Sequence, residues 1–248
     1  METSLIKTYE TPQDVARAVA DAFVTYTKQC IEETSSCVVA LSGGTTPNEL
    51  FTLLNTDEYR KQIDWENIFF LWVDERFIPQ NDPDNNYFKA RERLFSKLGC
   101  CAHVYPIPTD KGTVDEAAAR YEKEIETVFQ ACGKEQLDLV LLGLGDDGHL
   151  ASLFPKSEAL HERLHKVAPV TDGKVWDRIT LTLPMIIDSK EIWFTVVGDA
   201  KKAALSRVFR QIESYGDESW EKRVDKTLPA AILPQHNVHW FVDEKALP

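Results

Sequence analysis

The segment CVVALSGGTTPNE, residues 37–49, joins an apolar run to two glycines and a helix start, and this combination decides the expected fold. Residues 37–41 are apolar and partly β-branched, which is typical of a buried strand. After the glycines, Thr46 is expected to be the N-cap of a helix, Pro47 suits its first position, and Glu49 is placed for a capping box. The segment therefore predicts a strand, a tight turn and a helix, the repeating unit of an α/β protein.

The same alternation extends along the chain on both sides of this segment. Helical faces are expected at residues 12–33, 113–131 and 200–212. Apolar runs predict further strands at residues 68–73, 137–142, 179–183, 192–197 and 238–242. The polar segment 215–226 is interpreted as a surface excursion. We therefore expect one α/β domain over residues 1–248, with a mostly parallel sheet and helices on both faces.

Charge and composition narrow the classes of partner. The formal net charge is −12, and nucleic acids or anionic membranes need a concentrated basic surface, so neither is an expected partner. The five cysteines show no CxxC pair or metal-ligand spacing, which predicts free thiols and no metal site. No basic leader or apolar run of membrane-spanning length occurs, so a cytoplasmic location is the default expectation. The sequence does not predict an oligomeric state.

The glycine turn after residues 37–41 is the first candidate site. Ser42, Gly43, Gly44 and Thr45 offer hydroxyl and main-chain N–H groups at the positive end of the expected helix, a setting that suits a phosphate. A tight, well-capped turn without a ligand is the alternative, because such turns are common. The turn is neither a Walker loop nor a GxGxxG motif.

The glycine-rich stretch 143–155 contains the main catalytic candidate. It follows the apolar run 137–142, and ligands of open α/β sheets bind at the carboxyl ends of the strands. His149 can take up a proton near neutral pH, and Asp147 is close enough in sequence to accept the other ring N–H. With Gly148 between them, these residues predict a general base and its acidic partner. The alternative is a loop histidine beside solvated carboxylates.

Side chains at other strand and helix ends are candidates for anion binding. Arg76, beside Asp74, can donate a forked pair of hydrogen bonds to a phosphate or an oxyanion, although a salt bridge within residues 74–76 is equally consistent with the pattern. Asn86 begins a helical segment, Arg178 precedes a predicted strand, and Lys201 lies at the entrance of a predicted helix. Each basic residue becomes a credible phosphate ligand only if the loops converge.

Six stretches, in the same order along the chain, resemble those of the 6-phosphogluconolactonases. They are residues 42–47, 73–76, 143–155, 178–184, 198–201 and 228–231. The resemblance implies a modified Rossmann-like α/β fold and hydrolysis of 6-phospho-D-glucono-1,5-lactone to 6-phospho-D-gluconate in the pentose phosphate pathway. It also implies no metal or organic cofactor, with His149 as the catalytic base and Asp147 as its partner.

The resemblance further implies which residues bind the phosphorylated sugar lactone. The expected set is Ser42, Gly43, Gly44, Thr45, Asp74, Arg76, Asn86, Gly148, Arg178 and Lys201. Two positions depart from the family pattern: Thr45 stands where serine or arginine is frequent, and Asn85 replaces a serine. Both departures leave the expected base untouched.

Two other functions fit parts of the pattern. Glucosamine-6-phosphate deaminases resemble the chain and share its Asp-Gly-His core, but they carry a glutamate before the proline of this motif, where this chain has Phe154. A phenyl ring cannot relay a proton, so deaminase chemistry is not favoured. A non-catalytic sugar-phosphate sensor is the other alternative, but the chain shows no spare helix-turn-helix segment or basic patch for a DNA-binding regulator.

Overall fold

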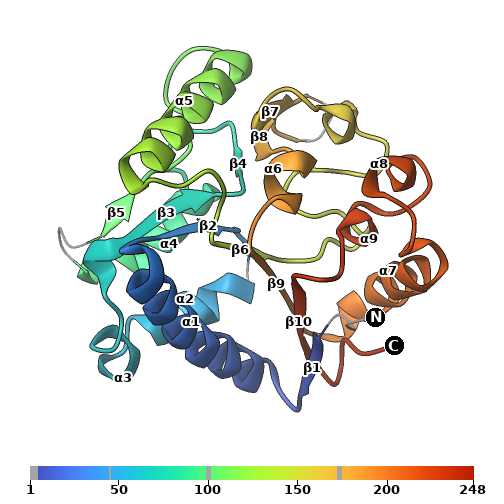
Figure 1. Cartoon of the computed structure of the whole chain (residues 1–248), viewed down its shortest axis with the longest axis horizontal. Helices are drawn as coiled ribbons and strands as arrows, with labels where there is room; N and C mark the ends of the chain where they lie inside the picture. The colour runs from blue at the N-terminus through green and yellow to red at the C-terminus, as the bar shows by residue number, and fades with distance from the viewer. Residues whose placement is uncertain (1–4, 45, 99–101, 172–174) are drawn as a thin grey trace.

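A seven-stranded parallel sheet forms the centre of the protein (Figure 1). The computed structural model describes residues 5–44, 46–98, 102–171 and 175–248. In spatial order the strands are β1 (Leu5–Tyr9), β10 (Val238–Asp243), β9 (Glu191–Val196), β6 (Leu139–Leu142), β2 (Cys37–Leu41), β3 (Ile68–Trp72) and β5 (His103–Val104). All neighbouring pairs in this sheet run parallel. The predicted mostly parallel α/β fold is therefore confirmed.

A smaller antiparallel sheet accompanies the main one. It contains β4 (Asp74–Arg76), β8 (Arg178–Leu181) and β7 (Val167–Val170), in that spatial order. Val73, the residue between β3 and β4, links the two sheets, because its N–H donates to Leu41 O and its carbonyl accepts from Leu181 N. The strand predicted at residues 179–183 exists, but it pairs with β4 and β7 and so belongs to the second sheet instead of the parallel one.

Helices cover both faces of the parallel sheet. The α-helices are α1 (Pro12–Thr34), α2 (Thr46–Leu54), α3 (Asp57–Arg60), α4 (Asn86–Arg93), α5 (Val114–Cys132), α6 (Leu183–Ile187), α7 (Lys202–Tyr215), α8 (Trp220–Arg223) and α9 (Pro229–Ile232). Short 3-10 helices are η1 (Trp65–Asn67), η2 (Phe95–Lys97), η3 (Glu158–His161) and η4 (Asp199–Lys201). Figure 1 shows α1 on one side of the sheet and α5 and α7 on the other; these correspond to the helices predicted at residues 12–33, 113–131 and 200–212. Within the described ranges, no helix is both long and apolar enough to cross a membrane.

Successive residues of β9 show how the two faces are filled, because strand side chains alternate between faces. Trp193 contacts Tyr26 of α1, with ring centroids 5.6 Å apart. Phe194 stacks on Trp240 of β10 at 4.1 Å, and Trp240 contacts Phe209 of α7. Each face of the strand is therefore packed against its own helix.

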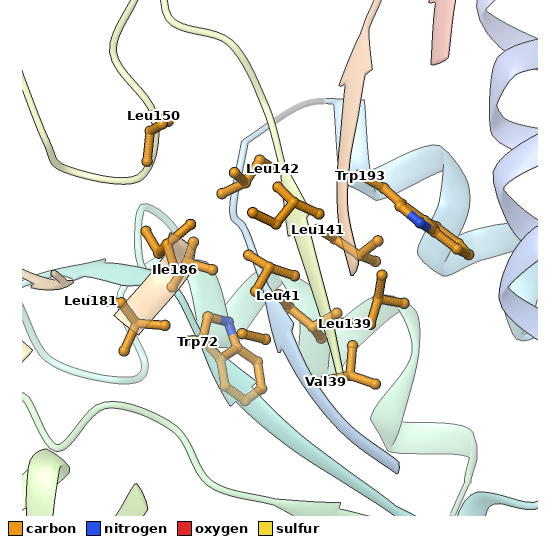
Figure 2. Close-up of a cluster of buried hydrophobic side chains, with 14 of the residues drawn as sticks. Val39, Leu41, Trp72, Leu139, Leu141, Leu142, Leu150, Leu181, Ile186 and Trp193 are labelled. Carbon is orange, nitrogen blue, oxygen red and sulfur yellow. The ribbon is translucent and has the colours of Figure 1, made fainter. Parts of the chain in front are cut away.

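Strands β2 and β6 are buried at every position, as their continuous apolar runs require. Figure 2 shows Leu41, Leu139 and Leu141 from these strands among side chains of neighbouring elements, including Trp72 of β3 and Trp193 of β9. The loops that follow β2 and β6 consequently begin from closely packed core.

One local expectation is wrong, and another is incomplete. Helix α2 begins at Thr46, so Thr46 is its first residue instead of its cap, and the Glu49 carboxylate accepts from Gln13 Nε2 of α1 at 3.4 Å. The segment 215–226 is not only a surface excursion: it contains α8, and Arg223 is 2% exposed and donates to Ala231 O at 3.2 Å. Arginine can be buried in this way because its long side chain is largely aliphatic and its guanidinium group can donate a hydrogen bond to a carbonyl.

Candidate active site

A cavity of about 340 Å³ lies at the carboxyl ends of β2, β6 and β9. The loops that follow these strands line it together with the small sheet. Of the predicted site residues, the cavity is lined by Ser42, Gly43, Gly44, Asp74, Arg76, Asn86, His149, Arg178 and Lys201. Asp147 and Gly148 belong to the same loop as His149, and Thr45 lies outside the described residues. The scattered basic residues therefore do converge on the loop that carries the expected base.

His149 is held in place by the carboxylate two residues earlier. Asp147 Oδ1 lies 2.5 Å from His149 Nδ1 and also accepts the His149 main-chain N–H at 3.1 Å. Burial raises the pKa of Asp147, but the hydrogen bonds and charge of His149 outweigh this effect, so the pKa lies below its usual range. An ionised Asp147 keeps the proton on Nδ1 and leaves Nε2 to accept another. The imidazole is 30% exposed, so solvent can reach it.

Gly145 makes room for this imidazole. A Cβ atom at position 145 would lie 2.1 Å from His149 Nδ1, closer than packed atoms can approach. The Gly145 N–H donates to His149 O, and its carbonyl accepts from Gly148 N, both at 2.9 Å. Gly148 O in turn accepts from Ala230 N of α9 at 3.1 Å. The glycines of the motif thus allow the main chain to pack closely against the histidine and to form the hydrogen bonds that fix the loop.

Gly145→Ala is expected to lower the turnover number by about 10–100-fold, because the added methyl group must displace the imidazole, and small displacements of reacting groups cost rate. Ser96→Ala, an exposed substitution outside the cavity lining, is the control. Steady-state kinetics would be measured for both variants, with circular dichroism to verify folding. Equal turnover in the two variants would contradict the steric role of Gly145.

Two arginines face each other where the small sheet borders the cavity. Arg76 of β4 and Arg178 of β8 are directly opposite in the antiparallel register. Arg76 Nη1 donates to Asp84 O. Arg178 Nη1 lies 3.9 Å from Asp74 Oδ2, and its guanidinium lies over the Phe154 ring, 5.6 Å from the centroid. Like charges directly opposite each other on a sheet repel, so this pairing favours an anion bound beside them.

Asp74 and Asn86 join the small sheet to the loop after β2. The buried Asp74 carboxylate accepts from Ser152 Oγ at 2.6 Å, and its main-chain carbonyl accepts from Asn86 Nδ2 at 3.1 Å. Asn86 packs so closely on Gly43 that a Cβ there would lie 1.9 Å from Asn86 Oδ1. On the far side of this loop, Ser42 Oγ donates to Leu141 O at 2.8 Å. These contacts fix the walls of the cavity.

Glu75 was expected at most to form a salt bridge within residues 74–76, yet it organises this corner of the site. Glu75 is 1% exposed, and its carboxylate accepts the main-chain N–H groups of Arg76 at 2.8 Å and of Asn86 and Tyr87 at 2.9 Å. It thereby joins β4 to the start of α4, whose cap is Asn85. Burial raises the pKa of Glu75 to about 7, although the three N–H groups lower it. The sequence contained one signal of this role. The first N–H groups of a helix have no partner within the helix, so the helix start predicted near Asn86 needed an acceptor such as a carboxylate.

The raised pKa of Glu75 predicts a pH-dependent loss of stability. Glu75 ionises near pH 4.5 in the unfolded chain and near pH 7 in the folded protein, so between these values only the unfolded state gives up the proton. The free energy of unfolding of the wild type should therefore fall, relative to Glu75→Gln, by about 3 kcal/mol as the pH rises through this window. Urea unfolding of both proteins at several pH values measures the difference. A difference that does not change with pH would contradict the assignment.

One cluster of possible metal ligands occurs in the described part of the chain. Cys30, Cys37 and Asp138 have ligand atoms within 4.8 Å of one another. The cluster lies at the amino ends of the strands, away from the cavity. Asp138 already binds the ammonium groups of Lys134 at 2.7 Å and Lys190 at 2.9 Å, and two cations so close oppose a metal ion. The residues therefore fit a buried ion-pair network better than a metal site.

Known proteins are similar to this chain in sequence and fold over nearly their whole length. The family model of glucosamine-6-phosphate isomerases/6-phosphogluconolactonase matches residues 10–242. A 6-phosphogluconolactonase of Synechocystis sp. is 34% identical, covering 94% of this chain and 92% of that protein, and one of Nostoc sp. is 32% identical, covering 97% of each. The solved structure of a 6-phosphogluconolactonase from Shewanella baltica is 23% identical and has a TM-score of 0.81, covering 98% of this chain and 97% of that one, which shows the common fold. The chain belongs to the glucosamine-6-phosphate isomerase/6-phosphogluconolactonase family.

Proposed function

We propose that this protein hydrolyses 6-phospho-D-glucono-1,5-lactone to 6-phospho-D-gluconate, with His149 as the general base and with no metal or organic cofactor. The observation that carries the proposal is the pairing of His149 with Asp147 in a cavity that two opposed arginines border. The names of the curated relatives support the same reaction. Residues 1–248 form one α/β domain, and the protein acts in the cytoplasm.

The reaction begins with activation of water. His149 Nε2 takes a proton from a water molecule while the oxygen of this water attacks C1 of the lactone. Asp147 stabilises the imidazolium that results, because its oxygen lies 2.5 Å from Nδ1. Negative charge develops on the former carbonyl oxygen, where Arg76 or main-chain N–H groups of the loops can donate to it; one such donor is worth about 10²–10³ in rate.

The second step opens the ring. The tetrahedral intermediate collapses, the bond between C1 and the ring oxygen breaks, and the imidazolium returns its proton to that oxygen. One histidine therefore serves both steps, and no nucleophilic serine or cysteine is required. Consistent with this, the sequence has no GxSxG elbow.

The remaining polar groups of the cavity suit the phosphate. Gly43 and Gly44 precede α2, whose first N–H groups carry partial positive charge, and Arg178 and Lys201 add full positive charges. The protein as a whole has a net charge of −12, but basic side chains are concentrated at this cavity. An anionic substrate needs such a local concentration of positive charge.

Phe154 argues against deaminase chemistry. Its ring packs on the His149 imidazole with centroids 4.6 Å apart, at the position where a deaminase carries the glutamate that relays a proton. A phenyl ring has no exchangeable proton. A lactone needs no such relay, because its ring opens by collapse of the intermediate.

A coupled assay tests the proposal. Lactone hydrolysis would be followed through a 6-phosphogluconate dehydrogenase and corrected for spontaneous hydrolysis, and ammonia release from glucosamine 6-phosphate would be measured in parallel. We expect lactone turnover well above the uncatalysed rate and no ammonia. Binding of sugar phosphates without turnover of either compound would support the sensor alternative instead.

A further inference from the structure

The catalytic loop carries a second carboxylate, Asp146, that the proposed mechanism does not use. Its Oδ1 lies 2.6 Å from Lys201 Nζ, and both residues line the cavity. The sequence suggested Lys201 as a phosphate ligand, but in the structure its ammonium group already has an anionic partner. A phosphate that reaches Lys201 must therefore compete with this carboxylate.

The ion pair is not required to hold the loop. The Asp146 side chain is 78% exposed, and exposed ion pairs contribute little to stability. The main chain of the loop is fixed independently: Arg207 Nη2 donates to Asp146 O at 2.7 Å, and Gly145 N donates to His149 O at 2.9 Å. Removing the charge of Asp146 should consequently leave the loop and the base in place.

The two acids that line the cavity differ in their surroundings. Asp74 is buried and bound by Ser152 Oγ at 2.6 Å, so it is part of the wall. Asp146 is exposed, and its carboxylate binds the ammonium group of Lys201 in the cavity itself. Its charge both neutralises Lys201 and repels a phosphate dianion that approaches it.

We propose that Asp146 is an affinity-determining residue, a counter-ion that weakens binding of the phosphate group at Lys201. The inference rests on the proposed function, in which the substrate and the product carry a phosphate. Its consequence is greatest for the product, which has a new carboxylate besides its phosphate and is the most anionic species in the cycle. The counter-ion would thus favour release of 6-phosphogluconate.

Asp146→Asn tests this proposal, because asparagine keeps the size of the side chain and removes the charge. We expect the dissociation constants of inorganic phosphate and of 6-phosphogluconate to fall by about three- to thirty-fold at low salt. The gain should shrink as ionic strength rises, since the charges are solvent-exposed. Isothermal titration calorimetry measures both constants, and inhibition by unphosphorylated glucono-1,5-lactone, which is neutral, should not change.

Two controls separate this mechanism from a general charge effect. Asp57→Asn removes a similarly exposed carboxylate, 68% accessible and paired with Lys61 at 2.9 Å, from outside the cavity, and it should leave phosphate binding unchanged. In a Lys201→Gln background, Asp146→Asn should lose most of its effect. Unchanged or weaker phosphate binding in Asp146→Asn, or equal tightening in Asp57→Asn, would overturn the proposal. Phosphate binding needs no turnover, so a wild type without lactonase activity would refute the proposed function separately.

Discussion

His149→Ala is expected to lower kcat for lactone hydrolysis by about 10²–10⁴-fold, which is the usual contribution of a general base. The variant removes the group that we propose activates water and later protonates the ring oxygen. The loop should keep its fold, because its hydrogen bonds from Gly145 N to His149 O and from Ala230 N to Gly148 O are made by the main chain. The coupled assay measures kcat and KM, and KM should change far less than kcat.

His165→Ala is the matched control for this substitution. His165 also lies near a carboxylate, with Nδ1 3.4 Å from Glu162 Oε2, but it is 59% exposed and lies outside the cavity lining. Its variant should have wild-type kinetics. If His149→Ala hydrolysed the lactone at a near wild-type rate, the assignment of the base would be wrong.

Asp138→Asn is expected to lower the free energy of unfolding by about 3–5 kcal/mol, the usual cost of leaving a buried charge without its partner. Asp138 is fully buried and binds two ammonium groups, one of them on Lys134, which is 5% exposed. Burial raises the pKa of Asp138, but the lysines and the Val38 N–H outweigh it, so the pKa lies below the usual range. Asparagine can still accept from Val38 N, so the variant isolates the charge.

Urea unfolding followed by tryptophan fluorescence measures this loss. Asp57→Asn is again the control, since its solvent-exposed ion pairs should contribute little to stability. Adding Lys134→Met to Asp138→Asn should recover part of the loss, because it removes the uncompensated cation. Equal stability of Asp138→Asn and the wild type would show that the buried network contributes nothing.

Local sequence patterns predicted the strand–loop units and the pairing of His149 with Asp147, for physical reasons; the role of His149 as the base stays a prediction. A short, continuous and β-branched apolar run such as residues 37–41 is typical of a strand covered on both faces, and carboxyl ends of parallel strands meet at one edge. His149 and Asp147 are two residues apart, so their contact depends on one loop and was visible in the sequence. The substrate roles of the predicted binding residues, and the single-domain organisation, stay predictions.

Contacts between distant parts of the chain were not predictable in the same way. The opposition of Arg76 and Arg178 depends on an antiparallel pairing that neither segment signals alone. The proposed counter-ion role of Asp146 depends on Lys201 of η4, which is distant in the sequence. Burial of Glu75 and of Arg223 is decided by tertiary packing, because polar residue types carry no signal of it.

The position of β10 constrains how the protein is made. β10 pairs with β9 on one side and β1 on the other, and within the described residues β1 pairs with β10 alone. Nearly the whole chain separates β1 from β10, so β1 leaves the ribosome long before its partner is synthesised. This side of the sheet can therefore close only after β10 has been synthesised, and closing so long a loop makes it a slow step of folding.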